Sequence, residues 1–195
     1  MRPSKSLLKN FKALVISVLP KAVHLKDVEI WFQDETRVGQ QGSLSRIWHY
    51  CGQRPRVIRQ QQFLSSYIFG AVCPARGVCP GELVQGENKE MMRRQMQEIS
   101  QHVSEGKHAV VVMDGALWHQ KNLNLANVTL LKLPPYSPEL NPMEQVWQLM
   151  KHRYLSNRCY KDINAIVDAC CEAWAGVCES TEIIQSLTQR CWASI

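Results

Sequence analysis

The hydrophobic pattern in the first half of the chain is typical of β-strands. Apolar residues concentrated in 28–33, 44–50 and 66–73 predict three strands. Glycines and prolines separate these runs, and the short spacing between them favours antiparallel pairing. The first strand is expected to end at Asp34, where two acidic residues follow the apolar run.

In the second half of the chain, helical periodicity alternates with uninterrupted apolar runs. A helix is predicted over 88–103, where apolar residues recur every three or four positions. The run 109–113 predicts a buried parallel strand, and 128–133 predicts another strand. The remaining periodic segments predict helices that begin at Asn141-Pro142 and that cover 163–177 and 183–187.

This order of elements predicts an α/β fold, in which a mixed five-stranded sheet carries helices on its faces. Residues 26–195 are expected to form the folded domain, and the basic residues 1–25 a helix and linker. The apolar run 13–19 is similar to part of a signal peptide. Because Pro20 ends that run early and no cleavage site follows, the pattern favours a helix.

The composition excludes two broad classes of protein. Apolar residues make up 45% and charged residues 21% of the chain, which is typical of a folded globular protein rather than a disordered one. No apolar run is long enough to span a membrane. The eight cysteines include no CxxC pair, which favours reduced thiols in a cytoplasmic protein over a structural zinc site.

The net charge of +6 is distributed unevenly. Residues 36–81 contain six arginines and no Asp or Glu, and glutamines and aromatic residues lie among these arginines. Arg and Gln side chains suit contacts with phosphate and sugar, so the segment favours nucleic-acid binding over a solvated basic face. The candidates for these contacts are Arg37, Arg46, Arg54, Arg56 and Arg59.

Three acidic residues lie where an α/β enzyme would gather them. Asp34 follows the first predicted strand, Asp114 follows the buried fourth strand, and Glu144 lies in the first turn of a helix after the fifth. If the first and fourth strands are neighbours, the two aspartates meet at the carboxyl ends of strands, where ligands gather in open sheets. Converging carboxylates need a counter-cation, and hard divalent cations take oxygen ligands. Together with the basic segment, the three acids predict metal-dependent cleavage or transfer of nucleic-acid strands.

Each of these residues also has a purely structural interpretation. Glu144 lies three residues after Asn141 and fits a capping box, an interpretation that the local sequence alone favours. Asp34 could begin a turn, and Asp114 before Gly115 forms a common turn pair. His119 could be a neighbour of a metal site, a general base or an ordinary loop residue.

Five segments carry distinctive motifs, namely WFQDET (31–36), GQQG (39–42), FGAV (69–72), MDGALWH (113–119) and LPPYSPELNPMEQVW (133–147). Together they resemble the DDE transposases of bacterial insertion sequences, in the branch related to mariner elements. The last motif is specific, because a proline-rich approach leads into Ser-Pro-Glu-Leu-Asn-Pro, an acidic residue and then Trp.

The resemblance implies a ribonuclease H-like fold for residues 26–195 and a DDE catalytic domain. Its catalytic triad, which binds Mg²⁺ or Mn²⁺ with two ions expected when DNA is bound, maps onto Asp34, Asp114 and Glu144. The resemblance selects Glu144 rather than Glu139 as the third acid, and it favours metal binding over capping. The candidates for supporting roles are Glu35, Asn141 and His119.

The resemblance also implies partners for the chain. The family acts on DNA, both transposon ends and target, and its full-length members carry N-terminal helix-turn-helix domains. Only about 25 residues precede the first predicted strand here, so the helix-turn-helix portion is expected from another reading frame. A homodimer on DNA, in the nucleoid of a bacterial cell, is expected as well.

The predicted function is therefore that of a transposase catalytic domain, which performs metal-dependent strand cleavage and strand transfer at transposon ends. Two alternatives stay open at this point. The chain could be a truncated, non-catalytic fragment that binds DNA or inhibits transposition, or it could be a ribonuclease H-like nuclease.

Overall fold

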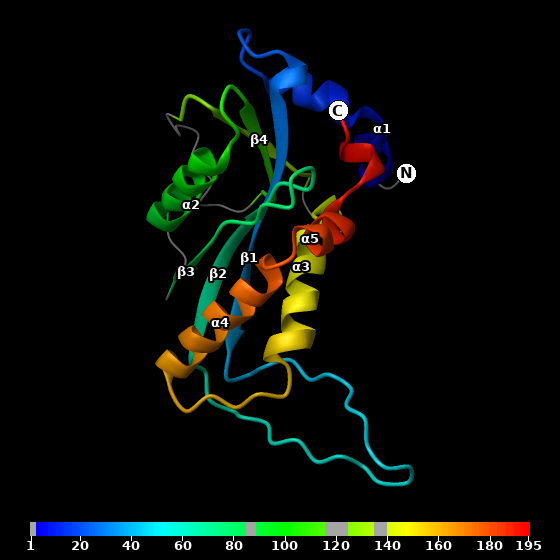
Figure 1. Cartoon of the computed structure of the whole chain (residues 1–195), viewed down its shortest axis with the longest axis vertical. Helices are drawn as coiled ribbons and strands as arrows, with labels where there is room; N and C mark the ends of the chain where they lie inside the picture. The colour runs from blue at the N-terminus through cyan, green and yellow to red at the C-terminus, as the bar shows by residue number, and fades with distance from the viewer. Residues whose placement is uncertain (1–2, 85–88, 116–124, 135–139) are drawn as a thin grey trace.

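The elements of the chain surround one central sheet (Figure 1). The computed structural model describes residues 3–84, 89–115, 125–134 and 140–195. The strands are β1 (Val28–Gly39), β2 (Ser65–Val72), β3 (Gly81–Val84), β4 (His108–Met113) and β5 (Val128–Lys132). The α-helices are α1 (Pro3–Val18), α2 (Lys89–His102), α3 (Met143–Met150), α4 (Ile163–Cys178) and α5 (Thr181–Thr188). A π-helical turn, Lys151–Leu155, continues α3.

The sheet is mixed and has the order β3-β2-β1-β4-β5. β1, β2 and β3 pair antiparallel, whereas β4 and β5 extend the sheet in parallel with β1. All six residues of β4 are buried, as a parallel strand covered on both faces requires. The predicted mixed five-stranded sheet with flanking helices is therefore confirmed.

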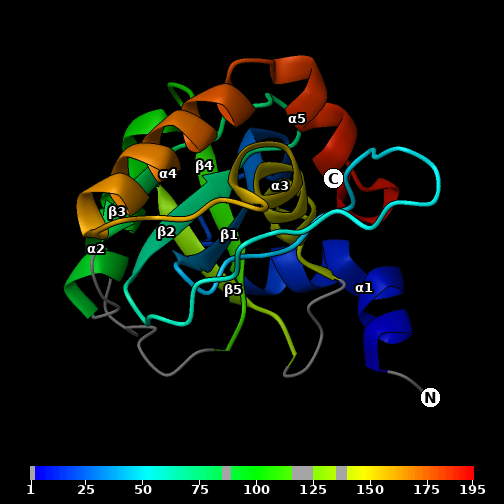
Figure 2. The ribbon, with the colours of Figure 1, turned by 90° about the horizontal axis from the view of Figure 1, so that it is seen from below.

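Helices cover both faces of the sheet (Figures 1 and 2). Neighbouring residues of β1 point to opposite faces, so that Phe32 packs in one core with α3 and α4, and Trp31 packs in a second core with α2. Alternation along β1 therefore decides which face each polar side chain reaches.

The prediction of a strand over residues 44–50 is wrong. Residues 43–64, here called the arm, form a long irregular excursion between β1 and β2 that extends away from the sheet (Figure 1). Trp48 is fully exposed, so the apolar residues of this segment do not mark a buried face. The sheet is completed instead by β3, which the pattern did not predict because only four residues form it.

β1 is also longer than predicted. It passes through Asp34 and continues to Gly39, because β2 pairs along it from Phe32 to Gly39. The predicted carboxyl end of this strand was therefore misplaced. Asp34 nevertheless lies beside the carboxyl end of the neighbouring strand β4.

The predicted N-terminal helix is confirmed as α1. Phe11 and Val15 of α1 are buried in the same core as α3 and α4, and Phe11 meets Trp192 edge-to-face at 4.9 Å between ring centroids. The eight cysteines are free thiols. Within the part of the chain that is described, no helix has both the length and the apolar character that a membrane crossing needs.

Candidate active site

Asp34 and Asp114 come from neighbouring parallel strands. The ladder between β1 and β4 pairs Phe32 with Val112. Each aspartate lies two residues beyond this pair, Asp34 inside β1 and Asp114 just after β4. Asp114 directly follows the last residue of β4 and is exposed. The sheet thus brings together two carboxylates that are 80 positions apart in the sequence.

The start of α3 is fastened to β1 beside Asp34. The buried side chain of Asn141 donates a hydrogen bond from Nδ2 to the carbonyl oxygen of Gln33 (2.8 Å). Its Oδ1 accepts a hydrogen bond from the backbone N–H of Met143 (3.1 Å), which caps the helix. One side chain therefore both begins α3 and fixes its place against the sheet.

Glu144 lies in the first turn of α3 and is exposed. Its Oε1 accepts a weak hydrogen bond from Nε2 of Gln148 (3.4 Å), while the capping bond of the helix comes from Asn141. The carboxylate is thus not engaged in the capping box that the local sequence allows. A groove of about 810 Å³ opens beside it, lined mainly by polar side chains of α3 and by Leu187 of α5.

The three acids share one electrostatic environment. Burial raises the pKa of Asp34, and the negative charges of Asp114 and Glu144 raise it as well, so that the pKa lies at about 6 instead of the ordinary 3.8. Hydrogen bonds from Trp147 and from the backbone N–H of Glu35 act in the opposite direction and lower this pKa. Asp34 is therefore a partly desolvated carboxyl whose charge is opposed by two neighbouring acids.

Trp147 holds the carboxylate of Asp34 in place. Its indole Nε1 donates a hydrogen bond to Oδ2 of Asp34 over 3.0 Å. Gly70, which pairs with Asp34 across the β1–β2 ladder, makes room for this indole, because a Cβ there would lie 2.6 Å from Trp147. In the sequence, Trp147 stands out only as the last residue of the motif at 133–147. Its position three residues after Glu144, on a neighbouring part of the helix surface, was the available signal.

The carboxylate oxygens of Asp34, Asp114 and Glu144 are suitable ligands for a hard divalent cation, although they do not form a complete coordination shell. Among the residues of the described ranges, no three His, Cys, Asp or Glu side chains form a group that could hold a metal ion. Mg²⁺ is commonly held by one or two carboxylates together with water and substrate phosphates, rather than by a full protein cage. Asp34 and Asp114 provide such a pair, and a cation would offset the mutual repulsion that raises the pKa of Asp34.

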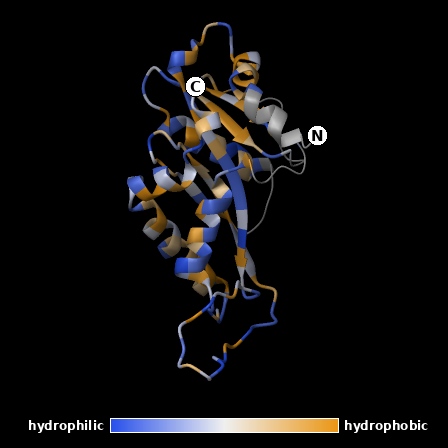
Figure 3. Cartoon of the chain, turned by 90° about the vertical axis from the view of Figure 1, so that its right-hand side faces the viewer, coloured by the Kyte–Doolittle hydropathy of each residue, from blue (hydrophilic) through white to orange (hydrophobic). Residues whose placement is uncertain are grey.

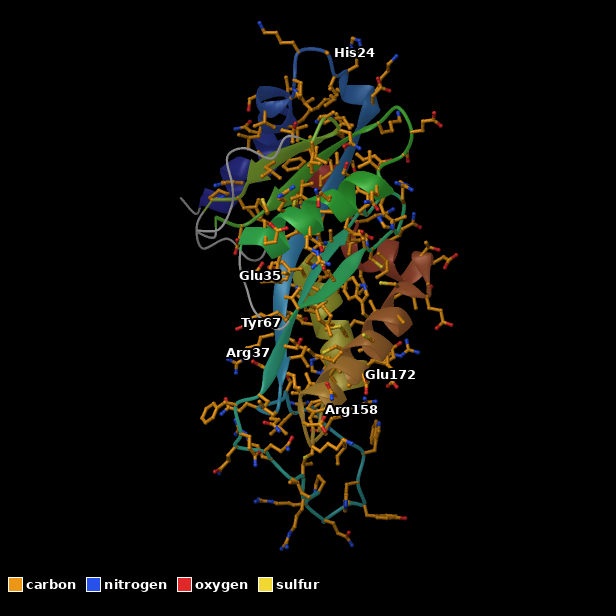
Figure 4. The ribbon with its side chains drawn as sticks, turned by 90° about the vertical axis from the view of Figure 1, so that its left-hand side faces the viewer. His24, Glu35, Arg37, Tyr67, Arg158 and Glu172 are labelled. Atoms are coloured by element: carbon orange, nitrogen blue, oxygen red, sulfur yellow. The ribbon has the colours of Figure 1, made fainter. Side chains whose placement is uncertain are left out.

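The candidate supporting residues are placed differently from one another. Glu35 follows Asp34 along β1, so its side chain points to the opposite face of the sheet, where Arg37 also lies (Figure 4). It is not brought together with Asp34, Asp114 and Glu144 on one face. Asn141 positions α3, as described above. His119 lies outside the described residues.

The candidate DNA-contacting arginines lie on exposed surface. Arg37 is exposed on β1, close to where this strand enters the arm (Figure 4). The others project from the arm, in which hydrophilic and hydrophobic residues alternate along the chain (Figure 3). They are Arg46, Arg54, Arg56 and Arg59.

The arm also exposes aromatic rings. Trp48 is fully exposed, and Tyr50 and Phe63 are each about 80% exposed. Exposed aromatic rings among cationic side chains are the usual stacking platforms of proteins that bind single-stranded nucleic acid.

Comparisons with known proteins agree with this architecture. The chain is similar to the uncharacterized protein y4pE/y4sA of Sinorhizobium fredii (strain NBRC 101917 / NGR234). The two are 45% identical over 130 residues, which cover 66% of this chain and 96% of that protein.

Solved structures of the Mos1 mariner transposase share the fold. The paired-end complex with Mg gives a TM-score of 0.65 at 16% identity, and it covers 94% of this chain and 55% of that chain. The strand transfer complex gives a TM-score of 0.63 at 16% identity, and it covers 94% of this chain and 54% of that chain. The chain thus spans about half the length of these transposases, and the ribonuclease H-like fold is confirmed.

The family follows from a match that covers most of the chain. Residues 29–167, which include Asp34, Asp114 and Glu144, match the family described as DDE superfamily endonuclease. The chain therefore belongs to the DDE superfamily endonucleases.

Proposed function

We propose that the chain is the catalytic domain of a transposase, which cuts DNA at the ends of a mobile element and joins the freed ends to target DNA. The observation that carries this proposal is the register of β1 and β4, which sets Asp34 beside Asp114 while Asn141 fastens the helix of Glu144 to the same strand. Membership of the DDE superfamily endonucleases supports the assignment of these acids to phosphodiester chemistry.

Asp34, Asp114 and Glu144 would hold two divalent cations, Mg²⁺ or Mn²⁺, with DNA phosphate completing the coordination. When bound, such ions activate the attacking oxygen and stabilise the charge on the transferring phosphoryl group. Trp147 keeps the carboxylate of Asp34 oriented, and Asn141 keeps Glu144 at the edge of the site. The description of related Mos1 complexes with Mg and with Mn supports these two metals.

In this proposal, DNA reaches the carboxylates from the side of the arm. Arg37 and the arginines of the arm would contact phosphates, and Trp48 would stack on unpaired bases. The groove beside Glu144, about 810 Å³ in volume, would take the strand near the scissile phosphate.

The proposed partners are DNA, both transposon ends and target, and further protein. A helix-turn-helix portion from another reading frame would recognise the ends, and two copies of the chain would act together on DNA. The Mos1 structures described as paired-end complexes, one of them with the left transposon end, support transposon ends as partners. The proposal also includes a bacterial insertion sequence as the source of the chain and the nucleoid as its place of action, and the similarity to a protein of Sinorhizobium fredii supports the bacterial source.

The test is metal-dependent nicking of supercoiled plasmid DNA. The wild-type chain is expected to nick in Mn²⁺ and not in EDTA, and Asp114→Asn and Glu144→Gln are each expected to reduce nicking at least 100-fold, a loss of about 3 kcal/mol in transition-state stabilisation. Glu172→Gln is the matched control, because it also removes one exposed carboxylate, from the outer surface of α4 (Figure 4).

Three outcomes would contradict the proposal. Nicking by Asp114→Asn at the wild-type rate would overturn the assignment of the acids. Salt-dependent DNA binding without nicking would indicate a non-catalytic fragment. Faster cleavage of RNA–DNA hybrids than of duplex DNA would indicate a ribonuclease H-like nuclease.

A further inference from the structure

Two cysteine thiols meet where the end of α4 lies against the turn between β2 and β3. Cys178 is the last residue of α4, and Cys79 belongs to the turn, residues 73–80. The Sγ of Cys178 donates a hydrogen bond to the carbonyl oxygen of Cys79 over 3.3 Å. α4 covers β2 and β3 on this face of the sheet (Figures 1 and 2). The fold thus brings together two thiols that are 99 positions apart in the sequence.

The turn is also fastened to α5, which follows α4 directly. Gln185 of α5 donates a hydrogen bond from Nε2 to the carbonyl oxygen of Ala75 over 2.8 Å. Gly77 allows the turn to approach α5 closely, because a Cβ at this position would lie 2.6 Å from the carbonyl oxygen of Thr181. The two thiols are therefore kept side by side by contacts in which they take no part.

Both thiols are within reach of small reagents. Cys79 and Cys178 are half-buried, whereas Cys73 and Cys170 have no exposed surface. A hydroperoxide is small enough to reach a half-buried sulfur, and it converts a thiolate into a sulfenic acid. A second thiol in contact with that sulfur condenses with the sulfenic acid, so the reaction ends at a disulfide rather than at a higher oxide.

The two thiols are suited to different steps of such a reaction. A hydrogen bond to the side chain of Cys79, burial and the negative charge that Cys79 carries as a thiolate raise the pKa of Cys178 above its ordinary value. Cys178 therefore keeps its proton, and the attacking thiolate is that of Cys79.

The atoms and electrons of the reaction balance with hydrogen peroxide as the oxidant. The sulfur of Cys79 attacks one oxygen, the O–O bond breaks, and the released hydroxide becomes water with the proton that Cys79 has lost. The sulfur of Cys178 then displaces the hydroxyl group of the sulfenic acid, which leaves as a second water with the proton of Cys178. Each sulfur gives up one electron, and the two electrons reduce the peroxide.

We propose that Cys79 and Cys178 are a modification site, a thiol pair that hydrogen peroxide converts into a disulfide and that a dithiol reduces again. The bond clips the end of α4 to the turn and closes a loop that contains β3, α2, β4, β5 and α3. Such a loop restricts the unfolded chain more than the folded one, so the oxidised protein resists unfolding. The site is independent of the proposed function.

The test is peptide mapping of the wild-type chain after treatment with hydrogen peroxide. Cleavage after Lys, Arg and Glu releases Cys79 in the peptide 77–82 and Cys178 in the peptide 173–179, each without a second cysteine. The two peptides are expected to appear joined and to separate after dithiothreitol. The melting temperature of the oxidised protein is expected to rise by about 5 °C or more, and dithiothreitol should reverse this rise.

Cys171→Ser is the matched control, because it removes an exposed thiol from the same helix. It should keep both the joined peptides and the rise in melting temperature. Cys79→Ser and Cys178→Ser should lose both, while their reduced forms melt within a few degrees of wild type. The proposal is overturned if peroxide oxidises Cys171 and leaves the peptides 77–82 and 173–179 unjoined. Joined peptides without a rise in melting temperature would also contradict it, because such a bond does not fit the native fold.

Discussion

The indole N–H of Trp147 donates a 3.0 Å hydrogen bond to Oδ2 of Asp34, which joins α3 to β1 at the centre of the candidate site. This bond lowers the pKa of Asp34 against the effect of burial. Glu144 and Trp147 lie one turn apart on α3, so the helix that carries one acid also supports another.

Trp147→Phe tests this relationship, because it keeps an aromatic ring and removes the donor. Loss of the bond raises the pKa of Asp34 further, so the acidic limb of the pH profile for nicking is expected to move to higher pH. The free energy of unfolding is expected to fall by about 1 kcal/mol.

Trp174→Phe is the control for that variant. The ring of Trp174 lies 5.4 Å from that of Trp147 between centroids, and the bond to Asp34 comes from Trp147. Trp174→Phe is expected to leave the acidic limb of the pH profile for nicking unchanged. An equal displacement in both variants would mean that ring packing, rather than the hydrogen bond, sets the pH profile.

Asp34 is expected to destabilise the metal-free protein at neutral pH. Its folded pKa of about 6 lies above the ordinary value of 3.8, so the unfolded chain loses this proton first as the pH rises. Stability from this group therefore falls between about pH 4 and pH 6 and stays low above that range, by about 3 kcal/mol in total. Asp34→Asn, in EDTA, is expected to be more stable than wild type at neutral pH and similar to it near pH 4.

Urea unfolding at both pH values measures this difference. Asp168→Asn, which changes an exposed aspartate of α4, should keep the wild-type pH dependence. The prediction is wrong if Asp34→Asn loses the same stability as wild type when the pH rises from 4 to neutral.

Asn141→Ala tests whether Asn141 positions Glu144 for metal binding, in addition to capping α3. It removes the cap of α3 and leaves the carbonyl of Gln33 without its partner, at a cost of about 2–4 kcal/mol. Glu144 then loses its fixed place, so the Mn²⁺ concentration needed for half-maximal nicking should rise at least tenfold while DNA affinity stays unchanged.

Asp162→Ala removes a comparable cap, because Asp162 accepts a hydrogen bond from the N–H of Ala165 at the start of α4. It is expected to cost about 1 kcal/mol and to leave the Mn²⁺ requirement unchanged. If both variants raised the Mn²⁺ requirement equally, helix stability alone would explain the effect of Asn141.

The outer part of the arm is expected to contribute binding and no stability. Every residue of 47–57 is exposed, so replacing this segment by a short Gly-Ser linker removes no core packing. The melting temperature should stay within a few degrees of wild type, whereas the salt slope of DNA binding should fall by about 2, since Arg54 and Arg56 are lost.

A variant with Arg54→Gln and Arg56→Gln in the full-length arm separates the effect of losing two positive charges on DNA binding from the effect of shortening the arm. It should reproduce the change in salt slope, and any additional loss of affinity in the shortened arm reports the stacking residues. A fall of more than about 2 kcal/mol in the unfolding free energy of the shortened arm would show that the arm packs against the domain.

Much of the fold could be predicted from local pattern. β4 was predictable because a continuous apolar run must be covered on both faces, and α2 because its apolar residues share one face. The arm was mispredicted because exposed apolar residues such as Trp48 follow the same pattern as half-buried ones. β3 has too few residues to give a periodic signal.

The candidate site was predictable only in part. That Asp114 follows a buried strand is visible in the sequence, whereas Asp34 lies inside β1 rather than at its end. The neighbouring positions of the two aspartates followed from one hypothesis about strand order. The bond from Trp147 to Asp34, and the close approach that Gly70 permits, depend on packing between α3, β1 and β2. Such contacts between distant segments leave no local periodicity to detect.

The ladder between β1 and β2 has a practical consequence. Eight residue pairs, from Phe32–Val72 to Gly39–Ser65, join the strands on either side of the arm. A protease that cleaves the arm would therefore leave two fragments clamped together by main-chain hydrogen bonds. Separately expressed halves that end and begin at the tip of the arm offer a route to conditional reconstitution of the domain.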